Sequence, residues 1–155
     1  MRRGPQDVPY APPLLAVVLA VYAALSLAMH AMGGNAFHAL AQMVLDVGLT
    51  LAATALLLRM AGYGARWVQT MTALAGSGVL LTLMAFPVAA AMTLTRIEGG
   101  GRLSLGVALL VLMVWSVMVS GVIYARALEV HRVVGIGIAM LLLIVAALLS
   151  KTLLY

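Results

Sequence analysis

The stretch that decides the fold is residues 36–58, AFHALAQMVLDVGLTLAATALLL, in which Asp46 is the one formally charged residue. A helix needs about 20 consecutive apolar residues to cross the hydrocarbon core of a bilayer. The stretch therefore predicts a transmembrane helix with an aspartate near its middle. The sequence Gly33-Gly34-Asn35 just before it favours a turn, which separates this helix from an earlier apolar run.

Four more apolar runs lie on either side of this stretch, bounded by turn sequences or basic residues. We expect an all-α, polytopic integral membrane protein, in which residues 1–155 form a single domain. The domain is a bundle of five transmembrane helices with short loops. The expected spans are 12–32, 36–58, 67–94, 103–125 and 133–154. Loops this short should make successive helices antiparallel neighbours.

The composition is typical of the same class of protein. Of the 155 residues, 65% are hydrophobic and 8% are charged, whereas soluble domains are about 45–50% apolar and about 25% charged. A soluble globular protein and a disordered chain are therefore excluded. The net charge of +5 comes from scattered loop residues, so we expect no nucleic-acid partner. The absence of cysteine excludes disulfides and thiolate chemistry.

The distribution of basic residues predicts the orientation, because Lys and Arg favour cytoplasmic loops. With the amino terminus inside, six arginines are cytoplasmic and three basic residues are outside. The first group is Arg2, Arg3, Arg59, Arg66, Arg126 and Arg132, and the second is Arg96, Arg102 and Lys151. We therefore expect an N-in, C-out protein, located in the inner (cytoplasmic) membrane of a bacterium.

Residues 1–11 form a proline-rich cytoplasmic segment before the first span. Closely spaced prolines disfavour a helix and favour an extended conformation. The segment is either a stiff lead-in to the first helix or a docking strip for a partner. Tyr10 at its end, Trp67 at the start of the third span and Tyr124 near the end of the fourth are expected to be interface anchors at the headgroup level.

Asp46 belongs to a polar stripe in which successive residues are four positions apart, so the stripe winds slowly around one helix face. Its members are His38, Gln42, Asp46, Thr50 and Thr54. Because an unpaired carboxylate in this environment would neutralise, we expect Asp46 to be protonated at neutral pH or hydrogen-bonded to hydroxyl groups of neighbouring helices. The candidate partners are Tyr22, Ser26, Thr82, Ser116 and Ser120.

Three interpretations of Asp46 remain open. The first is a hydrogen-bonded clasp between helices. The second is a proton or cation site, and the third is a contact with a lipid or a partner helix. We expect no metal ion or other cofactor, because His30 and His38 have no carboxylate close enough to complete a ligand set. His131 is expected at the opposite surface, which excludes haem ligation by two histidines.

Small residues in two spans predict close helix packing. They are Gly76, Ser77 and Gly78 in the third span, and Gly135 and Ala139 in the fifth.

The third span also carries residues 75–78, AGSG, which are similar to the Gly-x-Ser-Gly of intramembrane serine proteases. The first glycine is replaced by alanine, and no histidine lies within a facing helix to act as base, so we expect no enzyme. Pro87 further along the span removes a helix hydrogen bond and predicts a kink.

The fourth span contains a run from Val114-Trp115-Ser116 to Arg126-Ala127-Leu128 that is similar to the tryptophan-to-basic stretch of bacterial Yip1-type membrane proteins. Five spans, tiny loops and a proline-containing cytoplasmic amino terminus resemble the same family. The eukaryotic Asp-Leu-aromatic-Gly-Pro motif is missing, since Gly4-Pro5 precedes Asp7. The resemblance implies a non-enzymatic membrane factor that works through partner proteins or bilayer shaping, and it implies no catalytic residue.

These observations favour a non-enzymatic interaction, assembly or accessory subunit. Its contacts with a membrane-protein partner or a second copy are expected to run through the small-residue faces and the N-terminal segment. The alternative is a small transporter or channel subunit with a polar site around Asp46. A transport path needs polar lining to both surfaces, whereas residues 55–58 on the inner side of the stripe are apolar.

Overall fold

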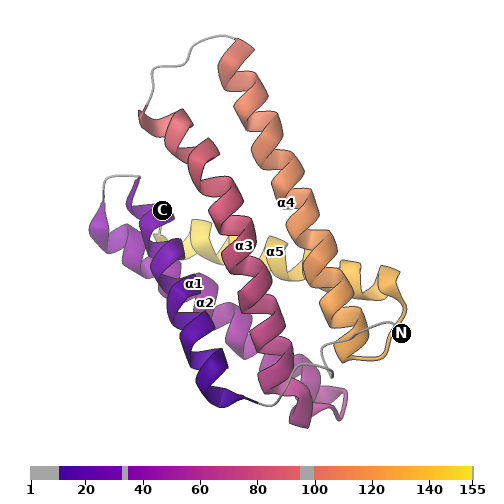
Figure 1. Cartoon of the computed structure of the whole chain (residues 1–155). Helices are drawn as coiled ribbons and strands as arrows, with labels where there is room; N and C mark the ends of the chain where they lie inside the picture. Colours follow the sequence, from indigo (N-terminus) through magenta and orange to yellow (C-terminus); the bar gives the residue numbers. More distant parts are fainter. Residues whose placement is uncertain (1–10, 33–34, 95–99, 155) are drawn as a thin grey trace.

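The structure, a computed structural model, describes residues 11–32, 35–94 and 100–154 (Figure 1). These ranges contain five long α-helices, a short 3-10 turn and no strand, which confirms the all-α prediction. The helices are α1 (Pro12–Ala31), α2 (Ala36–Met60), α3 (Trp67–Leu94), α4 (Gly100–Ala127) and α5 (Arg132–Leu154), and the 3-10 turn η2 is Gly64–Arg66. All five α-helices are long and apolar enough to cross a membrane.

The observed helices differ from the expected spans by a few residues at their ends. The largest difference is in α4, which begins at Gly100 and ends at Ala127, so that both Arg102 and Arg126 are helical. The expected bounds stopped at charged residues, but arginine has a high helix propensity. Hydrophobicity therefore predicts which residues can lie in a membrane. It does not predict where the helix begins and ends.

The helix ends are stabilised by local hydrogen bonds. Asn35 caps the first turn of α2, because its Oδ1 accepts from the backbone N–H groups of Phe37 at 3.1 Å and His38 at 3.4 Å. At the other end of α2, Gly62 has a φ of 80°, and the N–H of Tyr63 donates to the carbonyl of Leu58 at 2.7 Å. This reversal is a Schellman motif, in which glycine adopts the left-handed conformation without a Cβ clash.

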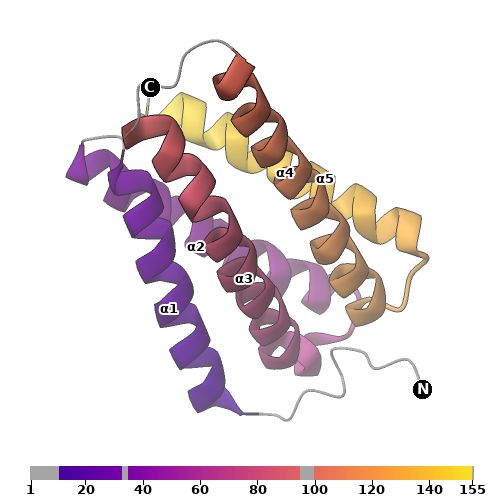
Figure 2. The same ribbon diagram turned by 45° about the horizontal axis from the view of Figure 1, so that its top comes forward.

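The helices do not pack in simple sequence order. Consecutive helices α1 and α2, α3 and α4, and α4 and α5 lie side by side, but α3 packs far more extensively against α1 than against α2. Figures 1 and 2 show α1, α3 and α4 running roughly alongside one another, with α2 and α5 behind them. The predicted antiparallel pairing of the second and third helices is therefore only a minor contact.

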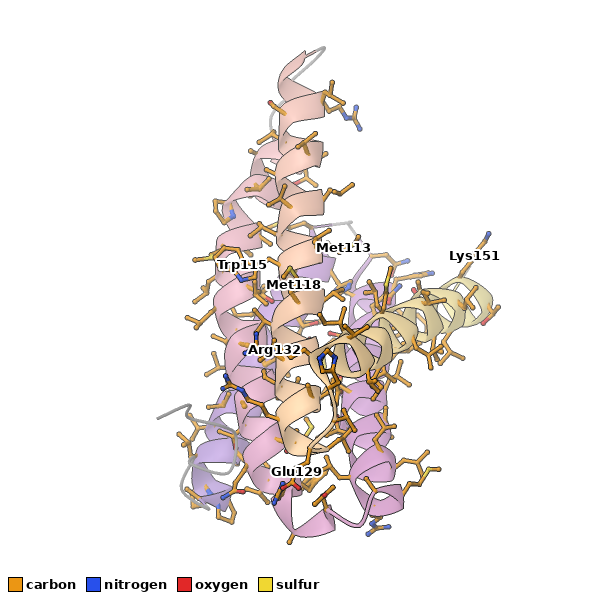
Figure 3. The ribbon with its side chains drawn as sticks, turned by 90° about the vertical axis from the view of Figure 1, so that its right-hand side faces the viewer. Met113, Trp115, Met118, Glu129, Arg132 and Lys151 are labelled. Atoms are coloured by element: carbon orange, nitrogen blue, oxygen red, sulfur yellow. The ribbon has the colours of Figure 1, made fainter. Side chains whose placement is uncertain are left out.

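α5 crosses the bundle at a steep angle. In Figure 3, α4 runs upright and α5 extends sideways from its lower half toward Lys151. The crossing is close at two glycines, because a Cβ added to Gly121 would lie 2.6 Å from the Cα of Ile136, and one added to Gly135 would clash with the carbonyl oxygen of Gly121. Small residues allow helix backbones to approach in this way.

Candidate functional site

The polar stripe of α2 faces the other helices. The Tyr22 hydroxyl of α1 donates a hydrogen bond of 2.7 Å to Oδ2 of Asp46. Tyr22 is one of the five hydroxyl groups that the sequence offers as partners for Asp46. The hydrogen bond explains how an acidic side chain is accommodated among apolar helices, because a buried carboxylate needs donors to replace water.

Two further members of the stripe bond to other helices. The hydroxyl of Thr54 lies 2.9 Å from the hydroxyl of Tyr124 in α4, and both residues are buried. The Gln42 side-chain amide donates to Oγ of Ser150 in α5. Side-chain hydrogen bonds therefore join α2 to α1, α4 and α5.

The other two members of the stripe make local contacts. Thr50 returns its hydroxyl to the backbone carbonyl of Asp46 at 2.8 Å. His38, in the first turn of α2, packs edge-on against the ring of Phe37. Gln42, Asp46 and Thr54 thus make interhelical hydrogen bonds, and Thr50, which lies between the last two, bonds within its own helix.

Tyr124, which the sequence predicts to be an interface anchor, is buried within the bundle. Only 3% of its surface is exposed, and its hydroxyl bonds to Thr54 inside the bundle. The chain turns back after α4, so Ala125, Ala127 and Leu128 around it are also buried. A tyrosine near the end of an apolar run looks interfacial from sequence, but the return of α5 covers it.

Glycine in α3 determines where the Tyr22 ring lies. A Cβ added to Gly78 would lie 2.8 Å from Cε2 of Tyr22, whereas one added to Gly76 would be 4.0 Å from the side chain of Val18. Gly78 therefore leaves the space that the tyrosine ring occupies beside Asp46. The small residues predicted to pack helices closely do so here, between α3 and α1 of the same chain.

A cavity of about 180 Å³ opens beside the Tyr22–Asp46 pair, with lining residues from all five helices. A second cavity of about 250 Å³ adjoins it, lined by α1, α2, α3 and α4. Tyr22, Asp46, Leu81 and Ser116 line both. Asp46 is thus part of the lining that the two cavities share.

Hydroxyl groups from several helices face these cavities. Thr50, Ser77, Ser116 and Ser120 line the first, and Ser26, Thr82 and Ser116 line the second. All five hydroxyl residues proposed from sequence as partners for Asp46 therefore line a cavity that Asp46 also lines. From the sequence, Ser77 is predicted only to pack helices, and Ser150 has no predicted role.

The two ends of the site differ. Toward the end of α1, the second cavity reaches His30, whose Nδ1–H donates to the carbonyl of Ser26 at 2.7 Å. Toward the end of α2, Thr54, Leu58 and Ala127 are fully buried and close the bundle. The second cavity therefore extends toward the His30 end, whereas buried side chains close the bundle at the Arg59 end, where residues 55–58 are apolar.

Three other residues that the sequence predicts to have a role are Trp67, Tyr10 and Pro87. Trp67 is the first residue of α3 and packs partly buried against the core, while Tyr10 lies outside the described residues. α3 continues through Pro87 as one helix to Leu94. Within the described residues, no group of three or more His, Cys, Asp or Glu side chains is placed to hold a metal ion.

The lining residues limit the chemistry. In the part of the chain that the structure describes, the cavities are lined by one carboxylate and several hydroxyls among aliphatic side chains, and by no Lys or Arg. The nearest histidine, His30, lines only the second cavity and bonds to a backbone carbonyl. Such a set favours binding of a cation or a polar solute over nucleophilic catalysis, which needs a nucleophile and a base in contact.

The chain matches no protein-family model, no curated protein and no solved structure. The resemblance to Yip1-type proteins therefore stays a prediction. The evidence on function comes from the cavities beside Asp46.

Proposed function

We propose that this chain is a non-enzymatic transporter or channel subunit that binds a small cationic or polar solute beside Asp46, and that the structure represents a state closed toward the Arg59 end. It would lie in the bacterial inner membrane with its amino terminus in the cytoplasm. Arg59, Arg66, Arg126 and Arg132 support this orientation, because they lie at the end where α2 and α4 finish and α3 and α5 begin.

One observation carries the proposal: Asp46 lines two adjoining cavities instead of being enclosed by packed side chains. A clasp between helices needs only the hydrogen bond to Tyr22. The clasp does not account for the space beside the carboxylate or for the hydroxyls from α3 and α4 that face it. Ionisable groups among apolar helices are costly, and those that face an internal cavity typically mark a solute or ion pathway.

The structure also weakens the reason for preferring an assembly subunit. The small residues expected to meet a partner are used within the chain, since Gly78 accommodates Tyr22 of α1 and Gly135 meets Gly121 of α4. The N-terminal segment, the other expected contact, lies outside the described residues. The binding site therefore has more structural support.

The test is uptake of radiolabelled monovalent cations into proteoliposomes that contain the purified chain. The probes are rubidium, tetramethylammonium and benzyltrimethylammonium. We expect uptake of at least one probe to be abolished by Asp46→Asn and retained by Glu129→Gln, which removes an exposed carboxylate elsewhere. Equal behaviour of wild type and Asp46→Asn toward all three probes would overturn the proposal.

A second candidate, assembly with another copy or a partner helix, is supported by the opposite face of α2. Its residues are exposed and four positions apart: Leu40, Val44, Gly48, Ala52 and Leu56. Gly48 and Ala52 form a small-xxx-small pair of the kind that mediates helix association in membranes.

Gly48→Val tests this candidate, because nothing lies within 4 Å of a Cβ added at Gly48, so the fold should tolerate the change. Gly106→Val in α4 is the matched control, with an equally open surrounding. Loss of energy transfer between labelled copies in vesicles for the first variant alone would support assembly through α2. The same energy transfer in wild type and both variants would exclude this face.

A further inference from the structure

We propose that the adjoining cavities bind an amphiphilic monocation, in which an ammonium head group carries a hydrophobic body. This inference rests on the proposed function and specifies its ligand class. It follows from the charge, the aromatic ring and the apolar walls of the same space.

The charge of the site favours a single positive head group. Among the described residues, Asp46 is the one acidic side chain that lines either cavity, and none of the described lysines or arginines lines them. Tyr22 bonds to Oδ2 of the carboxylate, which holds the group in place in the lining that the two cavities share. A monovalent cation beside Asp46 would balance its charge, whereas an anion would meet no cationic lysine or arginine.

An aromatic ring next to the carboxylate supports an ammonium group in particular. Tyr22 lines the first cavity and bonds to Asp46, whereas Tyr124, which also lines it, bonds to Thr54 about 12 Å further along α2. The faces of aromatic rings attract cations, and quaternary ammonium groups are recognised in this way. An alkali ion would instead exchange its hydration shell for one carboxylate and a few hydroxyls, which is unfavourable in apolar surroundings.

The walls favour a hydrophobic body next to that head group. Most side chains around the first cavity are aliphatic, including Leu74, Leu81, Val117 and Leu142. Its volume of about 180 Å³ is sufficient for a single aromatic ring, since benzene occupies an apolar cavity of about 150 Å³. The site can therefore hold a ring-sized apolar group together with the charge.

The second cavity lies next to the outer surface of the bundle. Met113 of α4 lines it and is also 50% exposed. Figure 3 shows Met113 and Trp115 on opposite sides of α4, with Met113 on the side toward α5. Met113 thus reaches from this cavity to the surface that lipid would cover.

The experiment measures binding of tritiated benzyltrimethylammonium to the purified full chain in a mild detergent. Tetramethylammonium has the same head group without the ring. Neopentylbenzene has the same shape, but carbon replaces the charged nitrogen. We expect benzyltrimethylammonium to bind at least about tenfold more tightly than tetramethylammonium, because only its ring uses the aliphatic walls. Neopentylbenzene should not displace it.

Variants then test the role of the carboxylate. Asp46→Asn should weaken binding at least about tenfold, as expected for the loss of a charge pair away from water, and Glu129→Gln should leave binding unchanged. The ranking of the three probes on the wild-type chain needs no variant, so the inference stays testable even where Asp46→Asn fails to fold.

The outcomes separate the ligand class from the proposed function. Tetramethylammonium binding as tightly as benzyltrimethylammonium would overturn the amphiphilic class, and so would displacement by neopentylbenzene. Asp46-dependent uptake of rubidium without binding of benzyltrimethylammonium would overturn this inference and leave the proposed function standing. Failure of every cation to bind or to be taken up would overturn both.

Discussion

At the scale of single residues, the position of Asp46 depends on two successive contacts. Gly78 leaves room for the Tyr22 ring, and the Tyr22 hydroxyl then reaches the carboxylate at 2.7 Å. The sequence could predict the polar stripe, because four-residue spacing places its members on one helix face. It could not select Tyr22 among five hydroxyls, because that choice depends on how α1 and α3 are rotated against α2.

The hydrogen bond should be measurable as a coupling between two residues. Tyr22→Phe removes the donor and Asp46→Asn alters the acceptor, and the double variant should lose less stability than the sum of the single variants. The expected coupling is about 1 kcal/mol, as for other hydrogen bonds between helices in membranes. Equilibrium unfolding of the reconstituted protein provides the measurement. Strictly additive losses would show that the bond contributes nothing to stability.

At the scale of helices, the crossing of α4 and α5 depends on paired glycines. Gly121 and Gly135 bring the two backbones together, and Ala139 is buried further along α5. The sequence predicted Gly135 and Ala139 as a packing face. It did not identify their partner, because small residues specify close approach but not which helix approaches.

An alanine scan of two glycines in α5 tests this crossing. A Cβ at Gly135 would clash with the backbone of Gly121, whereas nothing lies within 4 Å of a Cβ at Gly137. Gly135→Ala should therefore destabilise the protein by about 1–3 kcal/mol through overpacking. Gly137→Ala should be neutral or slightly stabilising, because alanine is the better helix former. The melting temperature in detergent distinguishes the two, and equal values would contradict the close crossing.

At the scale of the whole molecule, one ion pair joins two connections at the same end of the bundle. Arg66 of η2 lies 2.7 Å from Glu129 in the turn between α4 and α5, and Tyr63 donates to the same carboxylate at 3.0 Å. The Arg66 guanidinium also lies over the Tyr63 ring, 4.7 Å from its centre. Glu129 has a φ of 57°, a left-handed conformation that is unfavourable without glycine.

The ion pair makes stability depend on pH. Hydrogen bonds from Arg66 and then Tyr63, with the charge of Arg66, hold the pKa of Glu129 below its ordinary value of 4.5. A lowered pKa stabilises the folded protein above that ordinary value, and the stabilisation is lost as the pH falls through the lowered pKa.

The difference in stability between wild type and Glu129→Gln should therefore be constant near neutral pH and shrink in acid. The hydrogen bond to Glu129 raises the pKa of Tyr63, so its contribution is present below the ordinary tyrosine pKa and is lost as the pH rises through the raised value. Unfolding measured across pH for wild type, Glu129→Gln and Tyr63→Phe checks both limits. A difference in the free energy of unfolding between wild type and variant that does not change with pH would exclude a contribution of these ionisations to stability.

Features of single helices could be predicted from the sequence more completely than features of the whole molecule. Length and hydrophobicity predicted five helices and their bounds to within about three residues, because those properties are local to each run. The cavity, the burial of Tyr124 and the Arg66–Glu129 pair required the arrangement of helices that are distant in sequence. None of these has a local signal, since Arg66 and Glu129 were distinguishable only as loop charges.

The steep course of α5 has a consequence for the lipid around it. A bilayer whose normal follows α3 and α4 meets α5 at a pronounced tilt (Figure 3), and a tilted helix reaches through less thickness than an upright one of equal length. Acyl chains beside α5 must shorten or splay to match it. Lys151 near its far end can extend its amine to the phosphates, which would fix a local thinning of the membrane along that one flank.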